Sequence, residues 1–140
     1  GCAAVRHDPG VLAVGAPGPD IPPAVIRTGG EFDDFLSRVR SRPEAGALGP
    51  DSLAERLEVG RPDFDRQVLV VVRHDASSGS AFGFSTSNHH GALVCDIRTR
   101  RVGTVRDHRP YWFAVAVDRP GPERVEVRVD GQPSEARTGP

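Results

Sequence analysis

Serine, histidine and aspartate residues gather in one short stretch of the chain, and together they could carry out nucleophilic hydrolysis. His74 and Asp75 come just before the segment Ser77-Ser78-Gly79-Ser80, and a serine becomes a nucleophile when a histidine oriented by an acid takes its proton. The stretch lacks the Gly-x-Ser-x-Gly turn that exposes the nucleophile of many hydrolases. It also follows an expected strand, where polar loop residues are common. We therefore assign no catalytic residue and keep a small Ser/His hydrolase using residues 74–80 as an alternative hypothesis.

Histidines in a predicted turn could bind a metal ion. His89 and His90 are adjacent within the turn at 88–91, and neighbouring strand residues point to opposite faces, so their side chains would diverge. Structural zinc uses closely spaced Cys and His pairs, and blue-copper sites usually need a methionine, which this chain lacks. We expect exposed turn histidines with no metal and no other cofactor. A His-turn metal-binding domain is a second alternative hypothesis.

The two cysteines have different predicted roles. The chain begins Gly1-Cys2-Ala3, which is typical of a bacterial lipoprotein after cleavage of its signal, with Cys2 as the site of lipidation. The alternative is an ordinary cysteine at an arbitrary start of the chain. Cys95 lies at an inward position of a predicted strand, where a cysteine usually behaves as a small hydrophobic residue. We expect an inert Cys95; a Cys2–Cys95 disulfide and a catalytic Cys95 are the alternatives.

The composition limits the classes of partner. All 18 basic residues are arginine, 19 residues are acidic, and the formal net charge is -1. Such a balance provides no electrostatic footprint for nucleic acid and no polybasic patch for lipid, so we expect membrane contact only through a lipid on Cys2. Without lysine, mechanisms that need a lysine Schiff base are excluded. The arginine clusters, including 100–101, have acids nearby and are interpreted as solvated faces.

Apolar spacing predicts two helices in the first half of the chain. Residues 29–40 carry apolar side chains at i, i+3, i+4 and i+7, preceded by a capping box of Thr28 and Glu31. A second capping box, Ser52 with Glu55, predicts a shorter helix. The first helix should cover one face of the sheet formed by the later strands.

The rest of the chain predicts consecutive strands. The Val-rich run 67–73 suits a central strand covered on both faces, and further strands are expected at 81–86, 92–98, 102–106, 111–117 and 125–129. Early helices and late strands favour an α+β fold, with a mostly antiparallel β-sheet of about five to seven strands and one or two helices packed on one face.

The turn and strand signals divide the chain into three parts. Residues 1–23 form a Pro/Gly-rich leader or tether, in which 11–14 could add an edge strand; residues 24–131 form a single α+β domain, and 132–140 a flexible tail.

Large aromatic residues stand together late in the chain. In an alternating strand Tyr111 and Phe113 share one face and Trp112 lies on the other, so at least one ring needs cover from a helix or a partner. Burial in the core is the simpler interpretation. A partner-binding surface that includes Tyr111 and Trp112 is the alternative.

Several short motifs occur in a recognisable order. They are Val25-Ile26 at the end of a strand, Glu31-Phe32 at a helix start, Asp63-Phe64 before the hydrophobic strand, a Ser/Gly-rich turn into Phe82-Gly83-Phe84, and Pro110-Tyr111. Over about residues 24–130, this order resembles the PrcB-type family of protease-complex-subunit domains. The chain differs after the central strand, where that family has a Gly-rich segment and residues 77–82 are Ser-Ser-Gly-Ser-Ala-Phe.

The resemblance implies a compact α+β domain of a bacterial cell-envelope lipoprotein or secreted protein. It also implies a protein partner, such as a secreted protease, and supplies no catalytic residues. We therefore expect a non-enzymatic, extracytoplasmic protein-binding domain. An exposed strand edge could accept a partner strand through main-chain hydrogen bonds.

Overall fold

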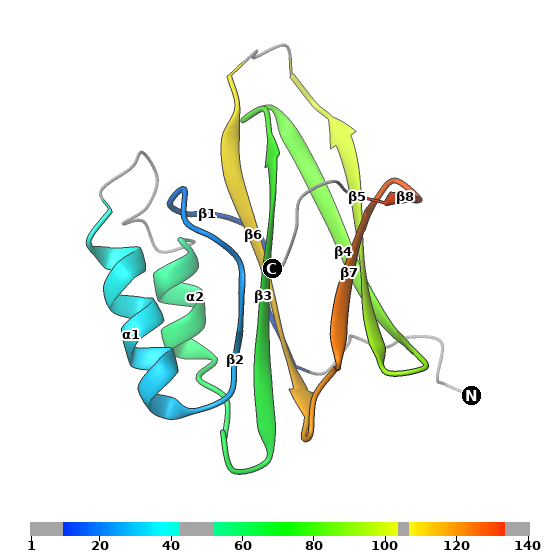
Figure 1. The fold of residues 1–140 in the computed structure, drawn as a ribbon. Helices are drawn as coiled ribbons and strands as arrows, with labels where there is room; N and C mark the ends of the chain where they lie inside the picture. The colour runs from blue at the N-terminus through cyan, green and yellow to red at the C-terminus, as the bar shows by residue number, and fades with distance from the viewer. Residues whose placement is uncertain (1–9, 43–51, 104–106, 134–140) are drawn as a thin grey trace.

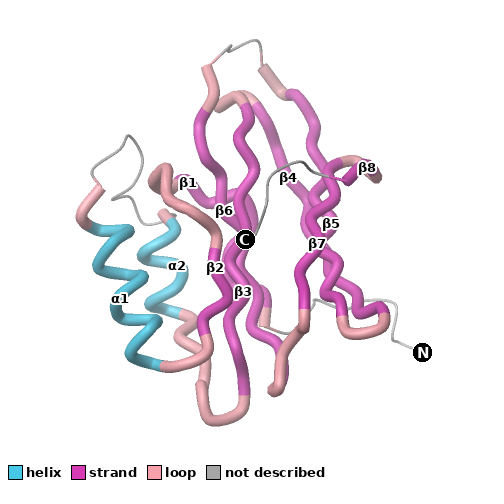
Figure 2. The backbone as a smooth tube through the Cα atoms, viewed as in Figure 1, coloured by secondary structure: helices cyan, strands magenta, loops and turns pink. Residues whose placement is uncertain are grey.

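The computed structural model describes residues 10–42, 52–103 and 107–133, which form two helices and eight strands (Figures 1 and 2). In chain order the elements are β1 Val11–Pro17, β2 Ala24–Ile26, α1 Gly29–Arg40, α2 Leu53–Val59, β3 Gln67–Ala76, β4 Ser80–His89, β5 Ala92–Arg101, β6 Arg109–Asp118, β7 Arg124–Val129 and β8 Gln132–Pro133. No helix in the described ranges is long and apolar enough to cross a membrane.

The strands form two sheets that stack face to face, with both helices on the outer side of the first sheet (Figure 1). The first sheet has the order β1-β6-β3-β2 and is antiparallel, whereas the second, β4-β5-β7-β8, contains one parallel pair, β5 with β7. The predicted α+β class, with mostly antiparallel strands and helices on one face, is confirmed. The division into two sheets was not predicted, because pairing between distant strands leaves no local signal in the sequence.

Strand β3 separates two hydrophobic layers. It pairs with β2 on one side and with β6 on the other. Leu69 and Val71 face the helices, whereas Val70 and Val72 face the second sheet, because successive strand residues point to opposite faces. A strand covered on both faces must be apolar on both, so the prediction of a central strand at 67–73 is confirmed.

Helix α1 begins and ends where the apolar spacing predicted. Its buried side chains are Phe32, Phe35, Leu36 and Val39. The Glu31 N–H donates to Thr28 Oγ1 at 3.1 Å, and the Arg27 N–H donates to Glu31 Oε1 at 2.8 Å. The first bond satisfies a backbone donor that a helix start leaves without a partner, and the second ties Glu31 to the residue before the N-cap Thr28.

Helix α2 forms as predicted, but its predicted capping box is wrong. Ser52 is the N-cap residue, yet its side chain makes no capping hydrogen bond. Glu55 instead lies toward α1, with its carboxylate 3.9 Å from the Arg40 guanidinium. Glu58 also pairs with Arg40, so both acids of α2 connect the two helices and neither folds back onto the helix start.

Two-residue turns close the hairpins β4–β5 and β7–β8. His90 and Gly91 have φ values of 51° and 84°, and Asp130 and Gly131 have φ values of 52° and 84°. Left-handed conformations at both central positions characterise the I′ turn, whose twist matches that of the flanking strands. The turn predicted at 88–91 is therefore confirmed.

The folded region extends beyond the predicted domain boundaries. Residues 11–17, assigned to the tether, form β1 and pair with β6, and Ala13 and Ala16 are buried in the helix-side layer. Gly15, with φ of 66°, lies at a register shift in this pair and not in a loop. At the other end β8 pairs with β7, although the tail was expected to begin at 132.

The second half of the chain also differs from the predicted strand boundaries. Strand β5 continues through 99–101, where a turn between two strands was expected, and ends at Arg101. Most of the strand predicted at 102–106 lies outside the described residues, as do Cys2 and residues 134–140.

The chain passes between the two sheets three times within the described region, at β3–β4, β5–β6 and β6–β7. The end of β3, the start of β4, the end of β5 and the start of β6 lie at one end of the sandwich, which we call the tip, whereas the connection from β6 to β7 lies at the opposite end (Figure 1). Strand ends from both sheets therefore meet at the tip.

Candidate functional site

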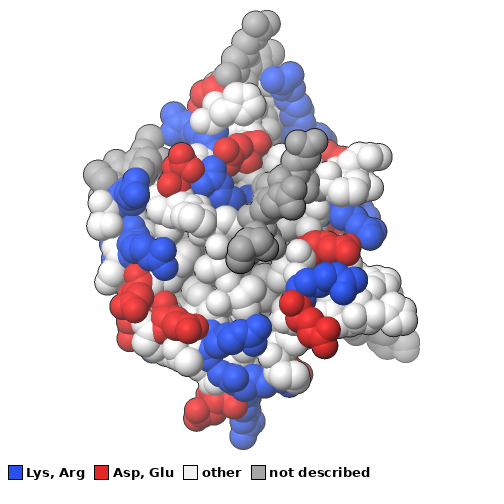
Figure 3. Space-filling view, viewed as in Figure 1, with Lys and Arg blue, Asp and Glu red and all other residues white. Residues whose placement is uncertain are grey.

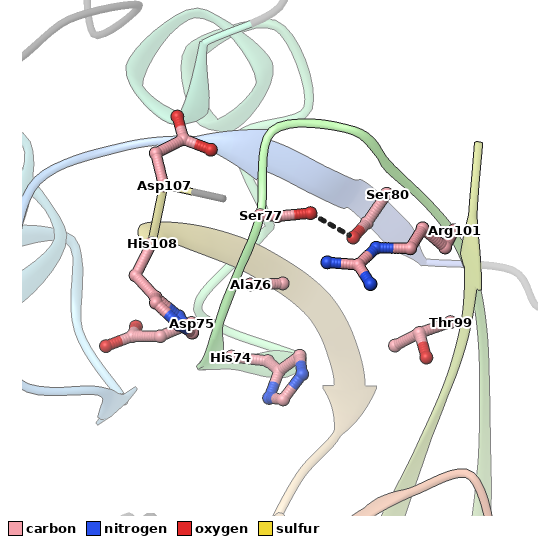
Figure 4. Close-up of a pocket in the computed structure, with 9 residues that line it drawn as sticks. All are labelled: His74, Asp75, Ala76, Ser77, Ser80, Thr99, Arg101, Asp107 and His108. Atoms are coloured by element: carbon pink, nitrogen blue, oxygen red, sulfur yellow. Dashed lines mark hydrogen bonds between the residues drawn. The ribbon is translucent and has the colours of Figure 1, made fainter. Parts of the chain in front are cut away.

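A polar pocket of about 690 Å³ lies at the tip (Figure 4). It is formed by the end of β3 and its following turn, the start of β4, the end of β5 and the segment before β6. Its lining residues are His74, Asp75, Ala76, Ser77, Ser80, Thr99, Arg101, Asp107 and His108. We call this site the tip pocket.

The tip pocket brings together residues of the hydrolase hypothesis without linking them into a triad. Ser77 Oγ lies 3.3 Å from Ser80 Oγ, and Ser78 Oγ donates to Asp107 at 3.0 Å. No hydrogen bond recorded among the described residues joins these serines to His74, which lies apart from them in Figure 4. The groups form separate polar pairs, whereas hydrolysis needs an acid, a histidine and a hydroxyl in series.

His74 is half-buried near the end of β3. Burial lowers its pKa from the ordinary value of 6.5, and the nearby carboxylates of Asp75 and Asp130 act in the opposite direction. The imidazole is therefore neutral near pH 7, with one N–H donor and one acceptor nitrogen. Asp130 accepts hydrogen bonds from Thr99 Oγ1 at 2.6 Å and from the Thr99 N–H at 2.9 Å, which lower the pKa of its carboxyl.

Both carboxylates that line the tip pocket already have cationic partners. Arg73 Nη2 lies 2.7 and 2.9 Å from the two oxygens of Asp75. Arg109 Nε donates to Asp107 at 2.7 Å, and the Ser78 N–H donates to it at 2.9 Å. The Ser78 N–H, together with the Arg109 guanidinium, holds the pKa of Asp107 at about 2.

Arg101 lines the tip pocket although, like Thr99, Asp107 and His108, it belonged to no predicted site. Its guanidinium extends from β5 toward Ser77 and Ser80 (Figure 4), and it has no ion pair or hydrogen bond with any described residue. Arg100 and Arg101 are both exposed, in agreement with the interpretation of 100–101 as a solvated face, but Arg101 also lines the tip pocket whereas Arg100 lies on the outer face of β5. The alternation of side chains along β5 could have indicated this difference, because adjacent strand residues point to opposite faces.

Cys95 lies between the two sheets as a free, buried thiol. Burial, with a further contribution from Asp96, raises the pKa of this thiol to about 12. The thiolate is the reactive form of cysteine, and this site strongly disfavours it. The expected role of Cys95 as a small core residue agrees with its position, whereas a catalytic role does not.

The turn histidines do not form a metal centre with other described residues. His89 and His90 are both exposed. Within the described ranges, no three His, Cys, Asp or Glu side chains come together in a way that could hold a metal ion. A metal site at this turn would therefore need ligands from elsewhere.

Of the two candidate partner-binding residues, Tyr111 and Trp112, the structure corrects the prediction for Trp112. Trp112 is fully buried; its Nε1 donates to the Pro19 carbonyl at 3.1 Å, and its ring packs edge-on against Phe35. Tyr111 lies on the opposite face with its ring centroid 5.0 Å from that of Phe82. The predicted alternation is correct, and the cover that Trp112 needs comes from helix α1, so it offers no accessible surface to a partner.

Strand β4 forms one edge of the second sheet. It pairs with β5 over ten residues without a register shift, and within the described region it has no strand partner on its other side. Its sequence, Ser-Ala-Phe-Gly-Phe-Ser-Thr-Ser-Asn-His, contains no Asp, Glu, Lys, Arg or Pro. The opposite edge of that sheet, β8, has two residues.

Charged side chains of both signs are interspersed over the face shown in Figure 3. This face contains no broad area of a single sign of the kind that attracts nucleic acid. The tip pocket and the β4 edge, in contrast, contain polar groups without described hydrogen-bond partners, and both are candidate binding sites.

Comparison with known proteins adds no assignment to these sites. No protein-family model matches the chain, and the searches of curated proteins and of solved structures give no match either. The resemblance to PrcB-type domains stays a prediction.

Proposed function

We propose that the chain is a non-enzymatic protein-binding domain that adds an extended segment of its partner to the edge of β4. The observation that carries this proposal is the length and regularity of that edge, with its complete lack of charged residues and proline. An added strand gains affinity from main-chain hydrogen bonds and specificity from alternate side chains.

The turn at the end of β4 identifies the main-chain groups that a partner would meet. The I′ turn makes His89 and Ala92 a hydrogen-bonded pair, and bonded and non-bonded pairs alternate from there along an antiparallel ladder. The outward groups are then those of Ser80, Phe82, Phe84, Thr86 and Asn88. In agreement, the Ser80 N–H donates to the Ser77 carbonyl at 3.2 Å and not to β5. The stretch from Phe84 to Asn88 thus offers outward groups without a described partner.

Exposed sheet edges normally carry features that prevent pairing with other chains. Charged side chains, proline, β-bulges and short strand length are the usual ones. β8 has the short length, and β1 has two register shifts. β4 has none of these features, so a function that uses the edge explains why it stays unprotected.

The class of partner follows from the family resemblance. PrcB-type domains are envelope lipoproteins or secreted domains associated with a surface protease, so we propose an extracytoplasmic location and a secreted protease or another exported protein as partner. In this role the chain is an accessory subunit, and the chemistry belongs to its partner.

Site-specific photo-crosslinking tests the role of the edge. A photoreactive amino acid replaces Ser85, an exposed β4 residue, and the protein is irradiated in an envelope extract. We expect one discrete crosslinked product. In the same protein Thr86→Pro removes an outward N–H, and Asn88→Pro removes the next one, so each change should abolish the product while the two-state unfolding transition is retained.

The matched control places the photoreactive residue at Ser37 on the exposed face of α1. Capture of the same product from Ser37, or its persistence in both proline variants, would overturn the proposal. A product with twice the mass of the chain would also overturn it, because it would identify a second copy as the occupant.

A further inference from the structure

Arg101 is the arginine among the described residues that line the tip pocket, and its guanidinium has no described acidic partner. Asp75 is bound by Arg73, and Asp107 is bound by Arg109. Asp130, close to the pocket, is bound by Thr99. Arg101 is left with a full positive charge and five N–H donors that meet no described partner.

Neutral donors surround the position to which the Arg101 guanidinium points. Ser77 and Ser80 share one hydrogen bond, so one of their two hydroxyl protons stays free for a ligand. His74 contributes an imidazole N–H from β3, on the other sheet (Figure 4). An anionic group between these residues would accept hydrogen bonds from both sheets.

The charge of the surroundings selects the kind of anion. A carboxylate carries one charge and matches the planar guanidinium with two parallel hydrogen bonds. A phosphate group carries about 1.5 to 2 negative charges at pH 7, and here it would lie near the carboxyl groups of Asp75 and Asp107. With Arg101 as the one arginine without an acidic partner among the described lining residues, the pocket favours a monocarboxylate over a phosphate.

The other lining residues indicate the chemistry of the rest of the ligand, beyond its anionic group. Ligand pockets are usually lined mainly by apolar side chains, but among the described residues that line the tip pocket Ala76 is the one apolar residue. Asp75, Asp107 and His108 at the pocket wall can accept hydrogen bonds from hydroxyl groups. A hydroxyl-rich molecule suits such a wall, whereas an apolar molecule does not.

We propose that the tip pocket binds the carboxylate of a hydroxyl-rich small molecule, which is the chemistry of a sugar acid such as a uronic acid. Arg101 binds the carboxylate, the Ser77–Ser80 pair and His74 add neutral donors, and the acidic wall accepts the sugar hydroxyls. This site is separate from the β4 edge used in the proposed function.

Titration of the purified protein with glucuronate, followed by amide chemical shifts or calorimetry, tests the site. We expect saturable binding with a dissociation constant of about 1 mM or lower, and much weaker binding of glucose and of inorganic phosphate. Arg101→Gln should weaken glucuronate binding by about tenfold or more, because it removes a charge-assisted bidentate contact.

Arg100→Gln is the matched control, because it removes the same charge from the adjacent residue on the opposite face of β5. Equal effects of the two substitutions, equal binding of glucose and glucuronate, or tighter binding of phosphate would overturn the proposal. Absence of saturable binding up to high millimolar glucuronate would overturn it too. Tighter binding of a short peptide through its terminal carboxylate would reject the sugar-acid class.

Failure of this site and failure of the proposed function are distinguishable. Thr86→Pro should abolish crosslinking from β4 without changing glucuronate affinity, and Arg101→Gln should do the reverse.

Discussion

The two sheets of this protein differ in how many faces they bury. The first sheet is covered by helices on one side and by the second sheet on the other, and its strands β3 and β6 have apolar runs. The second sheet buries its inner face and leaves polar side chains on much of its outer face. The first sheet therefore acts as a scaffold. The unprotected edge belongs to the second sheet, and the tip pocket with its unpaired arginine lies where the two sheets meet.

Among the substitutions that test this difference between the sheets, removal of the Trp112 side chain should lower the free energy of unfolding most. Trp112→Ala leaves a cavity between the first sheet and α1, and we expect a loss of about 3 to 5 kcal/mol in the free energy of unfolding. Urea denaturation measures it. Trp112→Phe should cost less, because it keeps a ring against Phe35 and loses mainly the hydrogen bond to Pro19. A loss below about 1 kcal/mol for the alanine variant would mean that the helix-side layer is loosely packed.

Paired substitutions in β7 test the one-sided burial of the second sheet. Val127 faces the interior, whereas its neighbour Glu126 faces outward beside Arg124 and Arg128. We expect Val127→Ala to lower the free energy of unfolding by about 2 kcal/mol, through the loss of buried methyl groups. Glu126→Ala should change it by less than about 0.5 kcal/mol. Similar costs at both positions would contradict the assignment of an inner and an outer face.

Substitutions at the two N-cap residues test whether the helices on the first sheet differ in their capping hydrogen bonds. Thr28→Ala removes a formed capping bond and should lower the free energy of unfolding by about 1 kcal/mol. Ser52→Ala should leave it unchanged or raise it, because the buried Ser52 hydroxyl has no hydrogen-bond partner in the part of the chain that the structure describes. Thermal unfolding of both variants side by side checks the difference, and equal losses would show that both caps form in solution.

The smallest expected effect is the contribution of His74 to the pH dependence of the free energy of unfolding. Because burial lowers the pKa of His74, the unfolded chain binds a proton at this residue more readily than the folded protein. Stability from this source is present above pH 6.5 and decreases as the pH falls below that value. His74→Gln should flatten the dependence of the unfolding temperature on pH between 7 and 5. Asp75 and Asp130 oppose the shift, and an unchanged slope in the variant would show that they cancel it.

A separate window at lower pH belongs to the carboxylates. The pKa values of Asp20, Asp107 and Asp130 are lowered from 3.8 by their hydrogen-bond partners. Their contribution to stability is complete above that pH and is lost as the pH falls further. The His74 prediction is therefore measured where these acids stay ionised.

Elements whose stability is local could be predicted from the sequence. The period of the buried residues in 29–40 and the Thr28 cap were sufficient for α1, and continuous valine content identified β3 as central. β1 was harder, because Gly15 and Pro17 are typical of loops and the strand depends on pairing with β6. The apolar run 11–14 indicated an edge strand, which β1 is, but its partner β6 and its continuation to Pro17 have no signal in the residues of β1 themselves.

The tip pocket was only partly predictable for a related reason. Residues 74–80 attracted attention as a local group of serine and histidine residues. Arg101 and Asp107 join them only because β5 and β6 return to the end of β3. The pairing of Asp107 with Ser78 further redirects the serine loop away from His74. The sequence allowed a Ser-His-Asp triad within residues 74–80, but it did not indicate that Asp107 would bind Ser78 instead.

The interleaving of the two sheets along the chain determines how the protein can fold. β1 and β3 are synthesised early, yet both need β6, and Val11 pairs with Val115. β6 in turn follows both β4 and β5, and β7, the parallel partner of β5, is made after β6. The first sheet cannot be completed before β6 has emerged, and the second cannot be completed before β8 has emerged. Folding on the ribosome must therefore wait until nearly the whole domain has emerged, and such distant pairings place the folding time at about milliseconds to seconds.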